Sequence, residues 1–526
     1  MAEGLLDKAN IILTPTGYKA GTMYNVAPIE QPYEDFVFSR ASVASRVNSS
    51  GLVEMVGRTL SSELVTNGDF TDGLNNWFVN ANATGYVSTS SDTLQYLVGH
   101  GDYAEVKQLN NSVIGKTYTG QFEVISKGTN ADVFIQYGRT SIYTGSINSL
   151  DLGVHTFTVV SSHTDGFSIS VRTNGIVEID NVSVKEIIDT NNIPRISYDS
   201  NGDNGHILLE PTSTNLVPYS ENFGQGYPYW KDEGGNQTID PNVEVAPNNT
   251  LTADKLTVSS SANETTRKLW YPRSTTPNTK YTFSVYVKSV NNEVNTGFIS
   301  IANLDVHINQ TFFTATNVWQ RVSVTATATA NTSRFLITGD SNCQVYIWGA
   351  QIEALSYATS YIPTLTGSTE TRATETATGA GSADLINSTE GVLYAEIAAL
   401  ANDGSVRYLS LTDGTSNNMV LVLYYSTANN IRTIVTSGGT NYMDKNYGVT
   451  SVLDFHKVAI RWKANDFSLW VNGSERKTDT SGSVPIGLNS LSFDSGTGSS
   501  NFYGKVKAVA VFNEALSDSE LNNLTG

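Results

Sequence analysis

The sequence predicts an all-β protein with three tandem antiparallel β-sandwich domains and a small, mostly extended N-terminal element. The first observation is periodicity: over 281–288, Tyr281, Phe283 and Val285 face one way and the polar residues between them face the other, as in a half-buried strand. The second is composition, because 10% aromatic and 16% charged residues are typical of folded β-proteins and not of disordered chains. The third is the length of 526 residues, which leaves room for three or four domains.

Two long segments carry the same landmarks in the same order, and this internal repeat defines two of the domains. Each copy opens with a Phe that is followed seven residues later by a Trp, and each closes on a similar strand: Phe70, Trp77 and 177–187 in the first copy, and Phe223, Trp230 and 345–355 in the second. Chance rarely matches order, spacing and residue type together. We therefore predict homologous sandwiches over 60–189 and 216–363, each with its Trp in the core.

The first sandwich interrupts the N-terminal part of the chain. Residues 1–59 end just before it, and 190–215 continue the same element just after it. The first and last strands of a sandwich are expected to pair, which brings the ends of the domain together and lets it occupy a loop of another element. We therefore predict an N-terminal element of 1–59 and 190–215, with 60–189 as an insertion.

The C-terminal part divides into a linker and a third sandwich. Residues 364–386 are rich in Thr, Gly and Ala and have almost no large apolar side chains, which is typical of an exposed linker. Alternating segments resume over 387–526 and predict the third sandwich. A helix is expected at the end, where Ser517 can cap the first turn and Glu520 completes a capping box.

The charge balance excludes several classes of partner. Lys and Arg total 32 against 50 Asp and Glu, a net charge of −18, whereas phosphate backbones and anionic membranes both require a cationic surface. No apolar stretch is long enough to span a membrane, and the N-terminus lacks the apolar core of a signal peptide. We expect a protein made in the cytosol, with no nucleic acid partner and no membrane insertion. The single Cys343 excludes an internal disulfide.

The repeated segments resemble the jelly rolls of carbohydrate-binding modules. NGDF with the following Trp, at 67–77, matches the opening strand of that family, and IDNVSV at 179–184 matches its closing strand. The second copy departs from the pattern, because Trp348 and Gly349 stand where the first copy has an Asp-Asn pair. The resemblance implies sandwiches of the jelly-roll type and a sugar ligand for at least one of them.

Two further resemblances concern the ends of the chain and the joints between its domains. LWVNG at 469–473 and the segment 502–521 resemble concanavalin A-like (laminin-G-type) jelly rolls. RASVASRVNSSGLVE at 40–54 and WGAQIEALSYATSYIPT at 348–364 resemble an arrangement found in bacteriophage virion fibre and appendage proteins. The first resemblance implies a fold, and the second implies a place in a virion.

Together these resemblances imply a non-enzymatic structural appendage of a phage virion, a tail or head fibre or spike. It would display glycan-binding sandwiches for attachment to bacterial surface polysaccharide, with weak sites combined by multivalency. The N-terminal element would anchor it to portal, capsid or tail proteins, and a homotrimer is expected by analogy with other fibres. The alternatives are an architectural head or collar decoration without a sugar ligand and, with less support, a capsule depolymerase.

Sandwiches that bind glycans commonly present aromatic rings to the C–H faces of sugars. The candidates are Tyr424, Tyr425, Tyr442 and Tyr447, which fall in or near expected loops, and Trp470, which falls on the polar side of its strand. The alternative is core packing, because burial of an aromatic ring stabilises a sandwich. For Trp470, packing against another domain is an equal alternative.

Arg40 and Arg46 are the most regularly placed charges of the N-terminal element. A guanidinium group can form two parallel hydrogen bonds with a carboxylate. These side chains are therefore candidates for docking on an acidic virion surface or for contacts between neighbouring subunits. The alternative is internal pairing with Glu34, Asp35 or Glu54.

Metal binding and catalysis have weaker support. The resemblance to carbohydrate-binding modules implies a structural calcium ion between Asp69 and Asp180, on the opening and closing strands of the first sandwich; the alternative is a turn cap and a solvated side chain. No other cofactor is expected. Glycosidases of the concanavalin A-like type need paired carboxylates, and the nearest match is Glu178 with Asp180, where Ser183 occupies the place of the third acid.

Overall fold

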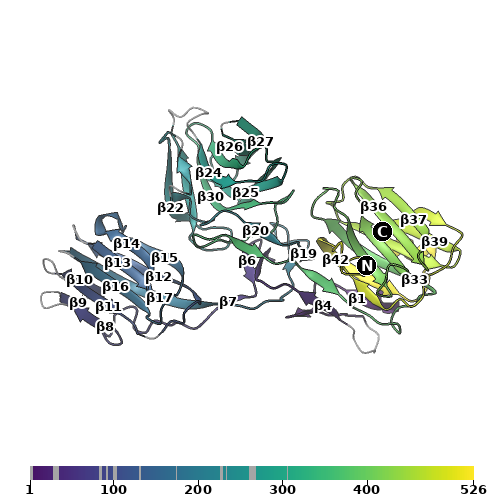
Figure 1. Ribbon diagram of the computed structural model, residues 1–526, viewed down its shortest axis with the longest axis horizontal. Helices are drawn as coiled ribbons and strands as arrows, with labels where there is room; N and C mark the ends of the chain where they lie inside the picture. The colour runs from purple at the N-terminus through teal and green to yellow at the C-terminus, as the bar shows by residue number, and fades with distance from the viewer. Residues whose placement is uncertain are drawn as a thin grey trace. The chain divides into compact units, whose positions relative to one another are not determined.

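The chain folds into two compact units, Met1–Gly57 together with Thr190–Gly526, and Arg58–Asp189. The computed structural model describes residues 4–27, 35–81, 86–90, 93–98, 103–109, 111–128, 132–172, 175–225, 229–232, 234–259, 268–304 and 306–526. Antiparallel strands account for nearly all of the described secondary structure (Figure 1), so the prediction of an all-β protein with β-sandwiches is confirmed. Thr190 N donates to Gly57 O at 2.6 Å, so the two ends of the first unit at the insertion point lie side by side.

The unit Arg58–Asp189, which we call the inserted sandwich, consists of two antiparallel sheets (Figure 1). In the first sheet the strand order is β15 (Gly153–Val160), β12 (Thr117–Lys127), β17 (Gly175–Asp189), β10 (Thr93–Val98) and β9 (Tyr86–Ser90), and β7 (Arg58–Leu60) also pairs with β17. In the second sheet the order is β14 (Thr140–Ser146), β13 (Asp132–Tyr137), β16 (Phe167–Arg172), β11 (Tyr103–Lys107) and β8 (Phe78–Ala81). Apolar side chains from both sheets form one core.

The middle sandwich, residues 216–363, has the same strand order. Its first sheet runs β28 (Gln320–Thr327), β25 (Lys280–Ser289), β30 (Gln344–Glu353), β23 (Ala253–Val258) and β22 (Gln237–Glu244). Its second sheet runs β27 (Val306–Ala315), β26 (Asn295–Asn303), β29 (Thr332–Gly339), β24 (Leu269–Ser274) and β21 (Lys231–Asp232). The repeated aromatic pairs coincide as well: ring centroids are 4.9 Å apart both for Phe70 with Trp77 and for Phe223 with Trp230, and both indoles are buried.

The C-terminal sandwich contains strands from both ends of the chain. One sheet has the order β18 (Ile196–Ser197), β19 (His206–Leu209), β42 (Gly504–Phe512), β33 (Glu390–Ala399), β38 (His456–Lys463), β39 (Asp466–Val471) and β40 (Ser474–Asp479), and β1 (Ala9–Leu13) also pairs with β42. The facing sheet runs β37 (Thr440–Gly448), β36 (Asn430–Ser437), β35 (Met419–Tyr424), β34 (Arg407–Thr412) and β41 (Ser490–Ser492). The core between them includes Ile11 and Ile207.

This sheet corrects the prediction of a separate, extended N-terminal element over 1–59 and 190–215. Both β1 and β19 pair with the free edge of β42, so the element supplies strands and core side chains to the sandwich expected at 387–526. The physical reason is that an unpaired edge strand exposes backbone N–H and C=O groups, which these distant strands satisfy. Local sequence patterns cannot reveal such a pairing.

The segment 364–386 is not the exposed linker that its composition predicts. β31 (Glu370–Arg372) pairs with β20 (Ser213–Asn215), and β32 (Thr376–Thr378) pairs with β4 (Phe36–Ser39). β4 also pairs with β3 (Thr22–Met23), which pairs with β2 (Tyr18–Lys19), while β5 (Ala44–Val47) and β6 (Val53–Val56) form a hairpin. Arg372, Glu375 and Ala377 are buried. The small side chains allow the segment to pass between other elements. Its buried charged residues form ion pairs with residues that are far away in the sequence.

Five fully buried charged residues, which we call the buried charge cluster, join these segments: Arg40, Arg195, Glu210, Arg372 and Glu375. Glu375 Oε1 accepts hydrogen bonds from Arg40 Nη1 at 2.6 Å and from Arg195 Nε at 2.8 Å. Glu210 Oε2 accepts from Arg195 Nη2 at 2.9 Å and lies 2.9 Å from Arg372 Nη1. Each carboxylate therefore lies between two guanidinium groups, which compensates the cost of removing these charges from water.

The cluster also binds both ends of the middle sandwich, through Pro211 just before it and Ser360 near its end. Ser360 donates to Glu210 from its backbone N at 2.8 Å and from its Oγ at 2.6 Å, and Arg372 Nη2 donates to Pro211 O at 2.6 Å. Burial alone would raise the pKa of Glu210, but the charges of Arg372 and Arg195 and the Ser360 hydrogen bonds lower it to about 2. The carboxylate therefore stays ionised at neutral pH and holds its partners in place.

One α-helix, α1 (Asp518–Thr525), occurs in the described part of the chain. The predicted capping box is confirmed: Glu520 N donates to Ser517 Oγ at 3.4 Å, and Ser517 N donates to Glu520 Oε2 at 2.8 Å. Leu521 and Leu524 bury this helix against the outer side of the C-terminal sandwich. Short 3-10 helices occur at η1 (Leu6–Lys8), η2 (Ile147–Ser149) and η3 (Phe223–Gln225). No helix within the described ranges has the length and apolar character needed to cross a membrane.

Removing one charge from the buried cluster should destabilise the larger unit. We expect Glu375→Gln to lower its free energy of unfolding by about 3–5 kcal/mol, because Arg40 and Arg195 would lose their shared carboxylate without becoming hydrated. Urea unfolding followed by tryptophan fluorescence measures the change. The control Lys8→Met breaks an exposed pair with Glu520 and should leave the midpoint unchanged. A Glu375→Gln variant as stable as the wild type would contradict this role of the cluster.

His206 should make the stability of the C-terminal sandwich depend on pH. Its buried ring, with Nδ1 at 2.8 Å from Asn204 O, has a pKa that burial and the nearby Lys505 and Lys507 lower to about 4. The unfolded chain takes up this proton near pH 6.5, whereas the folded chain takes it up only near pH 4. The free energy of unfolding therefore decreases as the pH falls from about 6.5 to about 4. The free energy of unfolding is measured at pH 7 and at pH 4, and we expect the difference between the two values to be about 3 kcal/mol smaller in His206→Asn than in the wild type. An unchanged pH dependence in the variant would refute the expectation.

Candidate functional site

Two of the aromatic residues predicted to bind glycans are buried. Tyr424 lies at the end of β35 in the core of the C-terminal sandwich, where its ring centroid is 5.8 Å from that of Phe502. Trp470, on β39, is 6% exposed because α1 and the N-terminal segment cover that side of the sheet, with Leu521 and Leu524 among its neighbours. Neither ring can stack on a sugar, so both predictions are wrong. Strand alternation gives the side of the sheet on which a residue lies, but not what covers that side.

Tyr425, Tyr442 and Tyr447 are half-buried, and a glycan contact for them stays a prediction. The guanidinium carbon of Arg432 lies 4.4 Å from the centroid of the Tyr425 ring, and that of Arg476 lies 5.1 Å from the centroid of the Tyr447 ring. These cation–π contacts cover one face of each ring. At most the other face of Tyr425 and of Tyr447 remains for a ligand.

The two arginines predicted to dock on a virion surface are both paired internally. Arg40 is fully buried in the cluster, where its Nη1 donates to Glu375. Arg46 Nε donates to Glu54 Oε1 at 2.6 Å, which is the alternative that the sequence left open. The docking prediction is therefore wrong for Arg40, which no partner can reach, and Arg46 already has a carboxylate. Glu34, another of the expected partners, lies outside the described residues.

Asp69 and Asp180 each hold a local hydrogen bond. Asp69 is exposed, and its Oδ1 accepts from Thr71 Oγ1 at 3.1 Å, as in a turn cap. Asp180 Oδ1 accepts from Asn181 N at 2.7 Å. Calcium takes six to eight oxygen ligands, and across the described ranges no three His, Cys, Asp or Glu side chains gather closely enough to hold a metal ion. The calcium ion stays a prediction.

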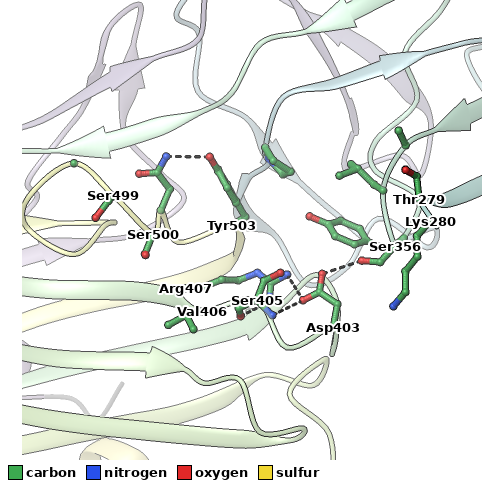
Figure 2. Close-up of a pocket in the computed structure, with 16 residues that line it drawn as sticks. Thr279, Lys280, Ser356, Asp403, Ser405, Val406, Arg407, Ser499, Ser500 and Tyr503 are labelled. Atoms are coloured by element: carbon green, nitrogen blue, oxygen red, sulfur yellow. Dashed lines mark hydrogen bonds and ion pairs between the residues drawn. The ribbon is translucent and has the colours of Figure 1, made fainter. Parts of the chain in front are cut away.

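A polar pocket opens between the middle and C-terminal sandwiches, which belong to the same compact unit (Figure 2). Its volume is about 600 Å³, within the usual range for ligand sites. One wall comes from the start of β25 and from the segment after β30, and the other from the loop before β34 and the loop before β42. The lining residues are Pro211, Thr279, Lys280, Ala354, Leu355, Ser356, Tyr357, Asp403, Ser405, Val406, Arg407, Gly498, Ser499, Ser500, Asn501 and Tyr503.

Asp403 joins the two walls of the pocket through an ion pair within its own wall and a hydrogen bond from the opposite one. Arg407, at the start of β34, donates from Nη2 to Asp403 Oδ1 at 2.9 Å and from Nη1 to Ser405 O at 3.1 Å. Ser356 Oγ, from the opposite wall, donates to Asp403 Oδ2 at 2.9 Å (Figure 2). Burial alone would raise the pKa of Asp403, but the Ser405 backbone N–H and the charge of Arg407 lower it. The carboxylate therefore stays ionised and bridges the walls.

Two tyrosine rings line the pocket. Tyr503 Oη accepts from Asn501 Nδ2 at 2.9 Å and shares a hydrogen bond with Thr374 Oγ1 at 2.9 Å, so its orientation is fixed. Tyr357 is half-buried, and its phenol interacts with the charges of Arg407 and of the buried charge cluster. Burial raises the pKa of Tyr357 well above its ordinary value. The neutral phenol can both donate and accept a hydrogen bond at physiological pH.

Several hydroxyl groups in the lining are free to bind a ligand. Those of Thr279, Ser405 and Ser500 make no hydrogen bond to any described residue. A hydroxyl can donate one hydrogen bond and accept two. The pocket therefore combines two phenol rings, of which Tyr503 is held by hydrogen bonds, with unused donors and acceptors that suit a polar, hydroxyl-rich ligand.

The aromatic and charged residues that the sequence singled out do not line this pocket. Most of the lining comes from 279–280, 354–357, 403–407 and 498–503, which are far apart in the chain and contain no motif of their own. The sequence segment 348–364 contains Ser356 and Tyr357 and is one of those that resemble virion fibre and appendage proteins. It was the part of the sequence that could have drawn attention to these lining residues. Only the folded arrangement brings these stretches together.

Comparison with known proteins supports the fold of the C-terminal part. A family model of the concanavalin A-like lectin/glucanases superfamily matches residues 393–522, so the resemblance expected for this region is confirmed. The match covers the facing sheet, the part of the first sheet from β33 to β42 and most of α1, and it leaves out β1, β18 and β19. A search of the curated proteins finds no match.

Solved structures similar to this chain include carbohydrate-binding modules. The CBM40 domain of the Ruminococcus gnavus IT-sialidase, bound to alpha2,3 sialyllactose, is 19% identical, with 28% of this chain and 94% of that chain covered and a TM-score of 0.25. The CBM22-1–CBM22-2 tandem domain of Paenibacillus barcinonensis Xyn10C is 10% identical, with 56% and 98% covered and a TM-score of 0.21. Domain 4 of AbnA, a GH43 arabinanase of Geobacillus stearothermophilus, in complex with arabinotriose, is 12% identical, with 29% and 73% covered and a TM-score of 0.25. At such scores these likenesses carry no inference about function.

Proposed function

We propose that the protein binds a polysaccharide in the pocket between its middle and C-terminal sandwiches. The observation that carries the proposal is the lining: the phenol rings of Tyr357 and Tyr503, the Asn501 amide and several free hydroxyls surround a volume of about 600 Å³. Recognition of a sugar needs hydrogen-bonding groups for its hydroxyls and an apolar ring for its C–H face. Both are present, and the volume suits a short run of sugar units.

The pocket favours binding over hydrolysis. Hydrolysis of a glycosidic bond uses two carboxyl groups that flank it, whereas Asp403 is the one acid among the lining residues. Its lowered pKa keeps it ionised, which does not suit a general acid. Arg407 and Ser356 already occupy its oxygens. The proposed activity is therefore lectin-like and non-enzymatic.

The wider proposal is a structural appendage of a phage virion, a tail or head fibre or spike. Its support is the resemblance of 40–54 and 348–364 to virion fibre and appendage proteins. These segments contact each other, because Ser45 Oγ donates to Tyr361 O. The two parts of the resemblance therefore lie together in the folded chain. Portal, capsid or tail proteins are the proposed partners, and a homotrimer is the proposed assembly, in which several weak pockets act together.

The rival proposal is an architectural head or collar decoration without a sugar ligand. Under that proposal the pocket would be an incidental gap between two sandwiches, filled by water. The two proposals differ in what a substitution at the pocket does to attachment, because an architectural protein needs its surface contacts and not the pocket hydroxyls.

Truncating a pocket tyrosine should weaken glycan binding. We expect Tyr357→Ala to lower the affinity for the best ligand on an array of bacterial surface polysaccharides by about tenfold or more, because the variant loses a ring face and a hydroxyl. The control Tyr346→Ala removes a half-buried tyrosine of β30 outside the pocket and should bind as the wild type does. Circular dichroism melting curves establish that both variants are folded. Equal binding by Tyr357→Ala and the wild type, or a wild type that binds no polysaccharide, would favour the architectural rival.

A further inference from the structure

The charges that line the pocket do not balance. Lys280 and Arg407 are cationic and Asp403 is anionic, so two positive charges face one negative charge. This local excess stands out in a chain whose net charge is −18. A cationic pocket within an acidic protein attracts an anionic ligand while the rest of the surface repels it.

Arg407 and Asp403 neutralise each other and are committed to the structure. Arg407 is buried, and its Nη1 and Nη2 bind Ser405 O and Asp403 Oδ1. Asp403 also accepts from Ser356 Oγ and from Ser405 N at 3.0 Å. The low pKa of Asp403 is consistent with this full set of partners. The pair therefore builds the wall and leaves little charge for a ligand.

Lys280 is the charge that remains. It is exposed and has no ion-pair partner among the described residues. Figure 2 shows its side chain on the side of the pocket opposite Tyr503, with no dashed line to its ammonium group. Its backbone is held as the first residue of β25, paired with Thr327 of β28. The backbone of Lys280 is therefore fixed, while its flexible side chain can place the ammonium group over the pocket.

Other carboxylates near the pocket are buried and occupied. Glu210 precedes the lining residue Pro211 and belongs to the buried charge cluster. Glu353 precedes the lining residue Ala354, and it is fully buried with its Oε1 accepting from Ser213 Oγ at 2.7 Å. Neither carboxylate is available to pair with Lys280 or to repel a ligand in the pocket at close range.

We propose that the pocket selects an anionic saccharide, whose acidic group binds the ammonium of Lys280 while its ring hydroxyls bind the free hydroxyls of the lining. This inference rests on the proposed function and adds the class of ligand to it. A lysine ammonium is a compact point charge that accepts either a carboxylate or a phosphate. The shared chemistry is therefore one negative charge on a sugar ring, supplied by a hexuronate or by a glycosyl phosphate.

The test compares matched acidic and neutral probes. The probes are a hexuronate trisaccharide, its methyl ester, and a phosphate-bearing oligosaccharide, each taken from the repeat units of bacterial polysaccharides and titrated by calorimetry. We expect the wild type to bind an acidic probe at least about tenfold more tightly than the neutral ester. The preference should weaken as salt concentration rises, because the lysine is exposed. The acidic probe that binds identifies the source of the charge.

Variants of Lys280 separate the charge from the rest of the pocket. Lys280→Gln should lower affinity for the acidic probe by about tenfold and leave affinity for the ester unchanged, and Lys280→Glu should lower it further. Lys280→Arg should keep most of the affinity because the charge remains. Lys477→Gln, at an exposed lysine on β40 outside the pocket, should behave as the wild type.

The outcomes distinguish the two proposals. Wild-type binding of the neutral ester as tight as that of the acidic probes would overturn the charge selection and leave glycan binding in place. Acidic probes that bind equally well to the wild type and to Lys280→Glu would also overturn it. Absence of binding to every probe and to the polysaccharide array would overturn both.

Discussion

The mutual compensation of buried guanidinium and carboxylate groups is the interaction on which the rest of this structure depends. Glu375 and Glu210 each lie between two arginines, and the residues of the cluster come from segments that are far apart in the sequence. Removing Glu375 would leave Arg40, and removing Glu210 would leave Arg372, buried without a carboxylate partner, which is far more costly than the loss of a surface ion pair. Through Pro211 and Ser360 the cluster reaches one wall of the pocket. The geometry of the proposed site is therefore set by charges that a ligand never touches.

The same principle explains why the pKa values of buried carboxyl groups in the larger unit are shifted in opposite directions. Burial raises the pKa of Glu221 to about 7 and that of Asp254 to about 6, because their partners are neutral hydroxyl, indole and backbone N–H groups. Burial acts on Glu210 as well, but two arginines and the Ser360 hydrogen bonds bring its pKa to about 2. As the pH falls, Glu221 and Asp254 gain their protons more easily in the folded chain and contribute stability, whereas Glu210 loses it.

The sequence was sufficient for features that repeat or that depend on neighbouring residues. Period-two alternation predicted an all-β chain, the Phe–Trp spacing identified two segments whose strands have the same order, and Ser517 with Glu520 predicted the helix cap. It was insufficient for pairings between distant segments. Nothing near Arg40 indicates Glu375 as its partner, and the small residues of 364–386 look the same in a buried strand as in an exposed linker. Trp470 was placed on the correct side of its strand, but the helix that covers it is far away in the chain. The pocket could not be predicted either, because its lining residues come from segments that are far apart in the chain.

Hydrogen–deuterium exchange of the full chain, with and without the bacterial polysaccharide proposed as its ligand, tests the central claim most directly. If the ligand occupies the pocket between the middle and C-terminal sandwiches, backbone exchange should slow in 354–357, 403–407 and 498–503, and should not change in the inserted sandwich. Protection confined to 58–189, or to the strands that carry Tyr425, Tyr442 and Tyr447, would contradict the account and move the binding site to another surface.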